Sequence, residues 1–194
     1  MKKHLSLTGK SILVAIILVA VWSPLTSVGQ TAQADTSKMT RAAVQKESLK
    51  PAYPKVVGYL SFIVPIVTIA NTTAYNFQGT TRIGFPVGVN ILYSEKFGFS
   101  YEFTPYIQAG NGTSKVSYIL FDPGTMFRFQ RGFTIITRLA FETTGRYGFT
   151  PVFNKVYART KDVNYFVALS TPVRFGNSAP SSIGLNVQFG FTFN

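Results

Sequence analysis

The chain has 194 residues, with nineteen lysine and arginine residues against seven aspartate and glutamate residues, a formal net charge of +12. It has no cysteine, which excludes disulfides, thiolate nucleophiles, thiolate metal sites and a lipidated N-terminal cysteine. Its single histidine is His4, so everything that follows the N-terminal segment lacks an imidazole.

The N-terminus has the parts of an export signal. Lys2, Lys3 and Lys10 form a positive segment before an apolar run, Ile12 to Trp22, that is shorter than the roughly 20 residues a spanning helix needs. Ala32-Gln33-Ala34 is a small-x-small cleavage site. We therefore expect a signal peptide over residues 1–34, cleaved after Ala34, with an uncleaved membrane anchor as the alternative. The mature chain would start at Asp35 with sixteen basic and seven acidic residues, a net charge of +9.

Residues 35–54 form a polar leader with too few apolar positions for an amphipathic helix. We interpret it as a flexible periplasmic tail, with a plug or partner-binding segment as the alternative. Beyond it, the basic residues are scattered rather than clustered, unlike those of a nucleic-acid-binding protein. Attraction to anionic lipid headgroups is the more natural consequence of the positive charge.

Residues 55–194 alternate between large apolar and small or polar side chains, the period of a strand with two different faces. Short polar turns divide this region, and Asn111-Gly112 is a strong hairpin signal. The pattern predicts eight strands: Val56–Ala70, Arg82–Ser94, Phe97–Ala109, Lys115–Phe129, Phe133–Thr143, Tyr147–Ala158, Val163–Phe175 and Ser182–Asn194.

The fourth predicted strand changes phase along its length. Its apolar residues occupy even positions up to Leu120 and odd positions from Phe127. We expect a β-bulge at Asp122-Pro123-Gly124, because one extra residue reverses the two faces. A true turn there is the alternative, but it would leave two pieces too short for the 9–11 residues of a tilted membrane strand.

The terminal strand has the cleanest alternation in the chain. Every odd position from Ile183 to Phe193 is large and apolar, and every even position is small or polar. A strand with one wholly apolar face needs a neighbour on each side if it lies in lipid, where unpaired edges are not tolerated. No stretch beyond the signal reads as a spanning helix, since the most apolar one, Val56 to Ala70, is interrupted by glycine, serine and proline.

The polar faces of the strands are mostly glycine, serine, threonine, asparagine and alanine, which suit the crowded interior of an eight-stranded barrel. A soluble barrel would fill that face with lysine and glutamate. Aromatic residues gather near strand ends, as membrane interfaces require. The sequence therefore predicts an all-β fold, an eight-stranded antiparallel transmembrane β-barrel preceded by a cleaved signal peptide and a short polar leader.

Residues 55–194 resemble the small outer-membrane β-barrel proteins of Gram-negative bacteria, of the eight-stranded OmpA-like and OmpX-like kind. Phe189, Phe191 and Phe193 resemble the aromatic C-terminal strand that the outer-membrane assembly machinery recognises in that class. The usual final phenylalanine is penultimate here and is followed by Asn194. The resemblance implies an outer-membrane location, contact with outer-membrane lipids and a monomer, with no nucleic-acid partner.

Barrel enzymes of the outer membrane place a histidine at the reaction centre, and the mature chain has none. We therefore expect no enzymatic activity, no catalytic or metal site and no cofactor. The leading hypothesis is a structural, adhesive or interaction role. A narrow channel for small solutes or ions is the alternative.

Charged side chains of inward parity predict a polar network in the lumen. They are Arg82, Glu102, Arg128, Arg138, Glu142 and Arg174, with Asp122 as a seventh if the fourth strand has the expected bulge. They are interpreted as an internal network that plugs the barrel, with a polar constriction or ion path as the alternative, because buried charges must be paired. Pairing about Asn111-Gly112 brings Glu102 roughly opposite Asp122, so we expect Arg138 to bridge both acids, with Arg128 as a fourth member.

Overall fold

A computed structural model describes residues 52–193. The predicted signal peptide, most of the predicted leader and Asn194 lie outside this range. Within it, no helix has the length and apolar character needed to cross a membrane. The described residues form one antiparallel sheet and a single 3₁₀ turn, η1 (Gln130–Gly132). Its strands are β1 (Lys55–Ile69), β2 (Thr73–Tyr75), β3 (Thr81–Gly84), β4 (Val87–Leu92), β5 (Phe97–Gly110), β6 (Thr113–Arg128), β7 (Phe133–Glu142), β8 (Tyr147–Arg159), β9 (Val163–Ser170), β10 (Val173–Phe175) and β11 (Ser182–Phe193).

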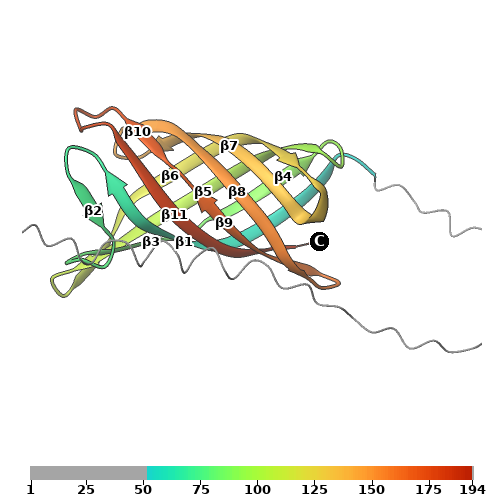
Figure 1. Ribbon diagram of the computed structural model, residues 1–194, viewed down its shortest axis with the longest axis horizontal. Coiled ribbons are helices and arrows are strands. Elements are labelled where there is room, and N and C mark those ends of the chain that lie inside the picture. The colour runs from blue at the N-terminus through green and yellow to red at the C-terminus, as the bar shows by residue number, and fades with distance from the viewer. Residues whose placement is uncertain (1–51, 194) are drawn as a thin grey trace, which may run out of the picture. The chain divides into compact units, whose positions relative to one another are not determined.

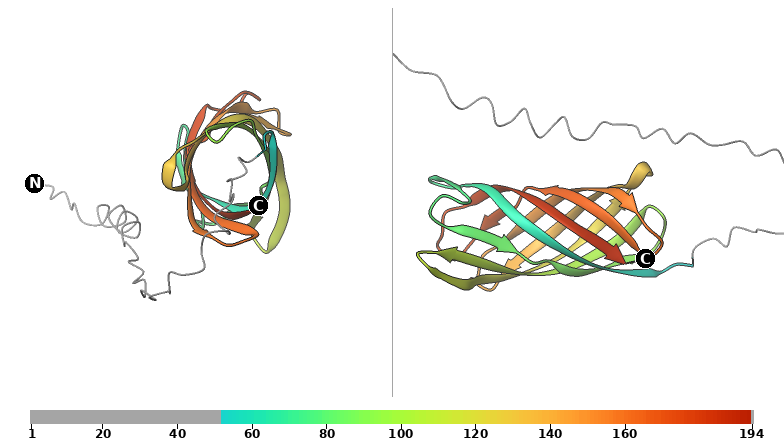
Figure 2. Two further views of the ribbon diagram at one scale, coloured as in Figure 1. Left: turned by 90° about the vertical axis from the view of Figure 1, so that its right-hand side faces the viewer. Right: turned by 90° about the horizontal axis from the view of Figure 1, so that it is seen from below.

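The sheet closes on itself. β11 pairs antiparallel with β9 on one side and with β1 on the other, where Phe62 lies opposite Phe189. Figure 1 shows the strands wrapping obliquely, and Figure 2 shows the closed ring from one end. β3 with β4 and β9 with β10 each form one wall, so the described residues make a barrel with eight walls. Closure gives each of the eight walls a paired neighbour on both sides.

Two prolines split the second and seventh predicted strands. Pro86 separates β3 from β4, and Pro172 lies between β9 and β10. Proline has no N–H to donate to a ladder. Pairing nevertheless continues across both breaks, because the Pro86 carbonyl accepts from Ser61 N (2.9 Å) and the Pro172 carbonyl accepts from Gly184 N (2.9 Å). Each wall is therefore kinked but not opened.

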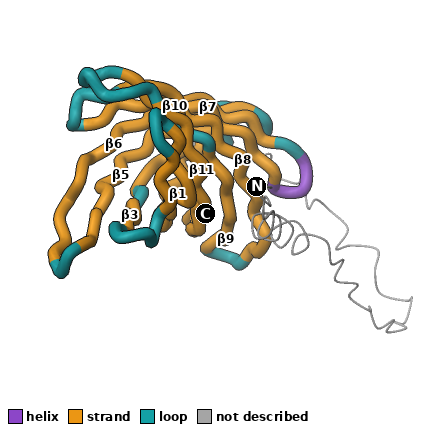
Figure 3. The backbone as a smooth tube through the Cα atoms, turned by 60° about the vertical axis from the view of Figure 1, so that its left-hand side comes forward, coloured by secondary structure: helices purple, strands orange, loops and turns teal. Residues whose placement is uncertain are grey.

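The turns gather at the two ends of the barrel (Figure 3). We call the end where β1 begins and β11 finishes the termini end; it carries the turns at residues 93–96, 129–132 and 160–162. The opposite end, the loop end, carries residues 70–80, 111–112, 143–146 and 171–181 around the strand ends. Between the first two predicted strands, residues 71–80 hold a strand that alternation did not indicate, since β2 pairs with the last residues of β1.

The predicted bulge at Asp122-Pro123-Gly124 is wrong. The register of β5 and β6 is unbroken from Phe97↔Phe127 to Tyr106↔Tyr118 and shifts only at the next pair, Ile107↔Val116. The extra residue is therefore Ser117, and every even position after it points inward. Tyr118 and Leu120 consequently lie in the lumen instead of sharing the outward face of Val116.

The outer surface of the barrel is apolar on every side. Each wall exposes at least two large apolar side chains, often by about half of their surface: Leu60 and Phe62, Val87 and Val89, Tyr101 and Phe103, Phe121 and Phe127, Leu139 and Phe141, Phe149 and Phe153, Tyr165 and Leu169, Ile183 and Phe189. The lumen also has apolar residues, in two separate clusters. One, nearer the termini end, contains Tyr59, Leu92, Met126, Ile136, Val152, Phe166 and Ala168, and the other contains Ile63, Tyr106, Leu120 and Ala140.

Candidate functional site

A buried ion pair crosses the lumen between the two apolar clusters. Glu102 comes from β5 and Arg138 from β7, and both side chains point inward because they share the parity of the small residues on their strands. Arg138 Nη1 lies 2.9 Å from Glu102 Oε2, and each residue is only 3% exposed. A charge this far from water needs a partner, and each residue supplies the other's.

Glu102 also accepts hydrogen bonds from three other side chains. Tyr59 donates its hydroxyl to Oε2 at 2.8 Å, and Thr104 donates to Oε1 at 3.1 Å. Gln188, on β11, donates through Nε2 to Oε2 at 3.4 Å and to Ser61 Oγ at 2.8 Å. The carboxylate thereby contacts β1, β7 and β11 as well as its own strand.

Arg138 is held by two further acceptors. Its Nη2 donates to Tyr59 Oη at 2.9 Å and to Ser100 Oγ at 3.0 Å, while Nε has no hydrogen-bond partner among the described residues. The guanidinium carbon also lies 6.0 Å from the centre of the Tyr59 ring. Tyr59 thus both donates to the acid and accepts from the base. We name Glu102, Arg138, Tyr59 and Gln188 the central network.

Asp122 lies beside the central network but is bonded less fully than predicted. It is directly opposite Glu102 in the β5–β6 register and 2% exposed. Its Oδ1 has no hydrogen-bond partner among the described residues, and the ion pair of Arg138 is with Glu102. Arg138 therefore does not bridge the two acids symmetrically. A pocket of about 10 Å³, lined by Asp122, Ser170 and Arg174 among others, adjoins this carboxylate.

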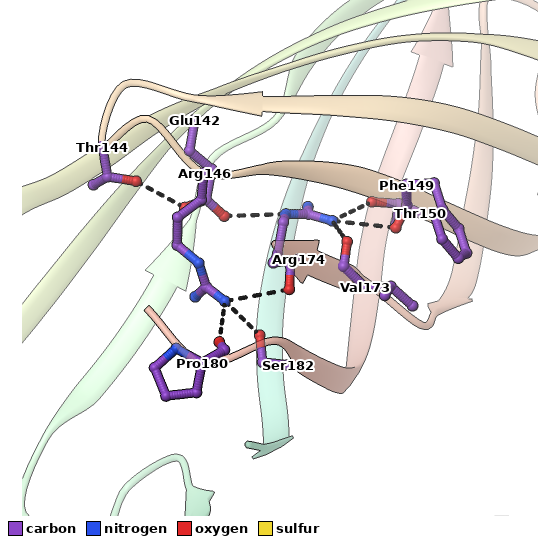
Figure 4. A network of polar contacts seen from close by, with 9 residues as sticks. All are labelled: Glu142, Thr144, Arg146, Phe149, Thr150, Val173, Arg174, Pro180 and Ser182. Carbon is purple, nitrogen blue, oxygen red and sulfur yellow. Dashed lines mark hydrogen bonds and ion pairs between the residues drawn. The ribbon is translucent and has the colours of Figure 1, made fainter. Parts of the chain in front are cut away.

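A second buried pair lies nearer the loop end (Figure 4). Arg174 Nε lies 3.0 Å from Glu142 Oε1, and Nη1 donates to Thr150 Oγ1 at 3.0 Å and to the carbonyls of Phe149 and Val173. Arg146 extends the same network by donating to Ser182 Oγ at 2.9 Å. The seven inward charges of the sequence prediction therefore fall into separate groups rather than one.

The remaining two arginines of that prediction have different surroundings. Arg82 donates through Nη2 to Gln108 Oε1 at 2.9 Å and lies 5.8 Å from the centre of the Tyr118 ring. Arg128 makes no side-chain hydrogen bond or ion pair with the residues that the structure describes, and it is not part of the central network. It lines a cavity instead.

That cavity lies in the half of the lumen nearer the termini end. It has a volume of about 510 Å³, reaches the turn residues of the termini end, and ends against Tyr59, Arg138 and Gln188. Arg138 and Gln188 also line the 10 Å³ pocket on the far side. The central network therefore separates a hollow half of the barrel from a filled half.

The C-terminal residues singled out from the sequence lie on β11. Phe189 and Phe193 are about half exposed on the outer face. The rings of Phe191 and Phe193 pack edge-to-face, with their centres 5.6 Å apart. Tyr59 and Gln188 were not predicted as site residues. Gln188 stands on the polar face of a strictly alternating strand, so its parity was a usable signal, whereas β1 alternates too imperfectly to mark Tyr59 as inward.

The described residues contain no group of three histidine, cysteine, aspartate or glutamate residues placed to hold a metal ion.

The chain matches no protein-family model and no curated protein. Among solved structures, it is similar to a protein from the de novo design of transmembrane β-barrels (9% identity, 75% of this chain, 98% of that chain, TM-score 0.45) and to the de novo designed TMB2.3, solved by NMR (12% identity, 73% and 94%, TM-score 0.44). It is also similar to Ail, the attachment invasion locus protein of Yersinia pestis, solved with a heparin analogue, sucrose octasulfate (8% identity, 72% and 98%, TM-score 0.38).

Proposed function

We propose that the chain is an outer-membrane β-barrel protein of the small, OmpA-like and OmpX-like kind, with a structural, adhesive or interaction role and no enzymatic activity. The observation that carries the proposal is the outer surface. All eight walls of a closed sheet expose large apolar side chains, around the whole circumference. In water such a surface would promote aggregation, whereas in a membrane its apolar side chains would contact the acyl chains of the lipids.

The interior supports a structural role over a wide pore. The central network and the cluster of Ile63, Tyr106, Leu120 and Ala140 fill the lumen from its middle toward the loop end. In an eight-stranded barrel the inward side chains are enough to fill the space. The charged groups there are mostly engaged with each other, as expected of a plug.

Cell fractionation tests the proposed location. We expect the protein in the outer membrane, with an N-terminus at Asp35, and a band on gels that shifts when the sample is boiled, because small barrels stay folded in detergent until heated. Recovery in the soluble periplasm would contradict the proposal. Mass spectrometry of lipid A and phospholipids after expression is expected to show no change, and a new lipid product would indicate an enzyme.

A narrow channel is the second candidate, and one observation favours it. The 510 Å³ cavity and the 10 Å³ pocket share Arg138, Val152 and Gln188, so a single layer of side chains separates them. Single-channel recordings in planar bilayers distinguish the two functions. The plugged barrel predicts no stable openings, whereas openings that disappear when the lumen is filled by larger side chains would establish the channel.

A further inference from the structure

The cavity at the termini end has the dimensions of a ligand site. Its volume of about 510 Å³ falls within the roughly 300–1,000 Å³ that small-molecule sites occupy. It is closed at its inner end by Tyr59, Arg138 and Gln188. It opens among residues of the termini end, including Lys55, Glu95 and Thr160. A molecule could therefore enter from one direction only.

The deeper walls of the cavity carry both apolar and polar side chains. Six walls of the barrel each contribute an apolar side chain: Val57, Leu92, Met126, Ile136, Val152 and Phe166. Asn90, Thr134 and Asn154 interrupt them. Asn90 is 8% exposed, and its Oδ1 has no hydrogen-bond partner among the described residues. A side-chain amide so placed can turn either its oxygen or its NH₂ group toward a ligand.

Positive charge is in excess around the cavity. Lys55, Arg128 and Arg159 line it against one lining acid, Glu95. Arg138, at the inner end, is neutralised by Glu102. Three unneutralised cations against one acid leave a net charge of +2 where a ligand would lie. The site therefore favours an anion.

Arg128 is the strongest anchor among these cations. It is half-buried, and its guanidinium makes no side-chain hydrogen bond or ion pair within residues 52–193. The guanidinium fork matches a carboxylate in a bidentate geometry. Apolar walls beneath a cationic entrance suit a molecule with one anionic end and one hydrocarbon chain.

We propose that the cavity binds a single-chain fatty carboxylate, with its carboxylate at Arg128 near the entrance and its chain along Leu92, Ile136 and Phe166. The proposal goes beyond the function proposed above, because a barrel plugged in its middle can serve as a scaffold without holding any ligand. It assigns a role to Arg128, which takes no part in the central network.

Fluorescence quenching tests the site directly. The only tryptophan is Trp22, inside the predicted signal peptide, so Phe166→Trp places one reporter on an inward side chain that lines the cavity. The mature protein is held in a non-ionic amphipathic polymer and titrated with 2-bromododecanoate, whose bromine lies beside the carboxylate. We expect saturable quenching that dodecanoate reverses and that dodecyltrimethylammonium, with the same chain and the opposite charge, does not.

Matched variants of the reporter protein test the anchor. Arg128→Gln should weaken binding about tenfold, the effect of removing one charge-assisted hydrogen bond. Arg131→Gln makes the same charge change at the same end of the barrel, on a residue that does not line the cavity, and should leave binding unchanged. Thr134→Phe, which fills the cavity, should abolish it. A boil-sensitive gel shift identifies the variants that remain folded.

Three outcomes would overturn the proposal. Non-saturable quenching equal to that of the Thr134→Phe variant would show that no ligand is held. Equal competition by dodecanol and dodecanoate, with no effect of Arg128→Gln, would show a site without charge selectivity. Binding that appears only after residues 35–51 are deleted would show that the chain's own leader competes for the cavity and that the intact protein binds no fatty carboxylate.

Discussion

The two halves of the lumen share the same eight walls but differ in how they are filled. Toward the loop end, Tyr106 stacks on Tyr118 with ring centres 4.6 Å apart, and Leu120 and Ile63 pack around them. Toward the termini end, the same barrel encloses about 510 Å³. The number of walls sets the diameter of a barrel, but the side chains decide whether that diameter is occupied.

The boundary between the halves is formed by the polar central network, and its stability depends on how well its buried charges are paired and hydrogen-bonded. A buried ion pair is costly unless its remaining hydrogen-bonding groups are satisfied. The central network has neighbours on both sides: apolar residues that exclude water on the filled side, and a cavity that ends against Arg138 on the hollow side. Predictions about stability can therefore be made by comparing matched substitutions across this boundary.

Removing Arg138 should have the largest effect. Arg138→Ala leaves Glu102 buried without its cation, and breaking such a pair costs about 3–5 kcal/mol. Urea unfolding of the barrel in a zwitterionic bilayer measures the loss. Equal stability of the variant and the parent would show that water from the cavity solvates the unpaired Glu102. That result would favour the narrow channel over the plugged barrel.

Truncating an apolar side chain should cost more in the filled half than in the hollow half. Leu120→Ala removes a 3% exposed side chain from a packed cluster, and such changes cost about 2–5 kcal/mol. Ile136 is almost as buried, 5% exposed, but it lines the cavity, so Ile136→Ala enlarges an existing space instead of opening a new one and the cost should be smaller. Equal costs in the same unfolding assay would mean that the cavity collapses in the membrane.

Enlarging a side chain should give the reverse contrast. Ala140→Phe forces a ring into a site with no exposed surface, where overpacking costs about 1–3 kcal/mol. Thr134→Phe directs the ring into the cavity and should cost less. Comparing the urea midpoints of the two variants measures the free space on each side of the central network. A larger loss for Thr134→Phe would contradict the assignment of the hollow half.

An outward substitution next to Arg138 should have the smallest effect. Leu139 is 57% exposed on the outer face of β7, so lipid replaces the contacts that Leu139→Ala removes. We expect a loss below about 1 kcal/mol, far from the Arg138→Ala value one position away. A large loss here would mean that this face of the barrel packs against protein rather than lipid.

Much of the barrel could be predicted from alternation alone. A period of two identifies strands and separates faces, and the positions of β5, β7 and β8 follow it closely. The hairpin signal at Asn111-Gly112 brought Glu102 roughly opposite Asp122, and the extra residue at Ser117 makes them direct partners in the β5–β6 register. Turn chemistry and parity are local properties, which is why they were visible in the sequence.

Features that depend on several strands at once could not be predicted. Leu120 and Tyr118 are apolar, and periodicity does not distinguish an apolar residue that fills a lumen from one that faces outward. For that reason the bulge was assigned to the conspicuous Pro123-Gly124 and not to Ser117. The cavity depends on the summed volumes of side chains from several strands, and the lack of an acidic partner for Arg128 among the described residues depends on which side chains lie across the lumen.

The contacts of Glu102 also bear on the order in which the barrel assembles. Its carboxylate receives Tyr59 from the first strand and Gln188 from the last, and Gln188 also donates to Ser61, 127 positions away in the chain. Contacts between such distant segments carry the largest loop-closure entropy and tend to form late in folding. Until the first and last strands meet, the acid lacks Gln188, whereas Tyr59 reaches it across Gly88 of β4, which pairs with both β1 and β5. Pairing of β1 with β11 thus completes the shell of hydrogen-bond donors around Glu102, and these bonds stabilise the closed ring.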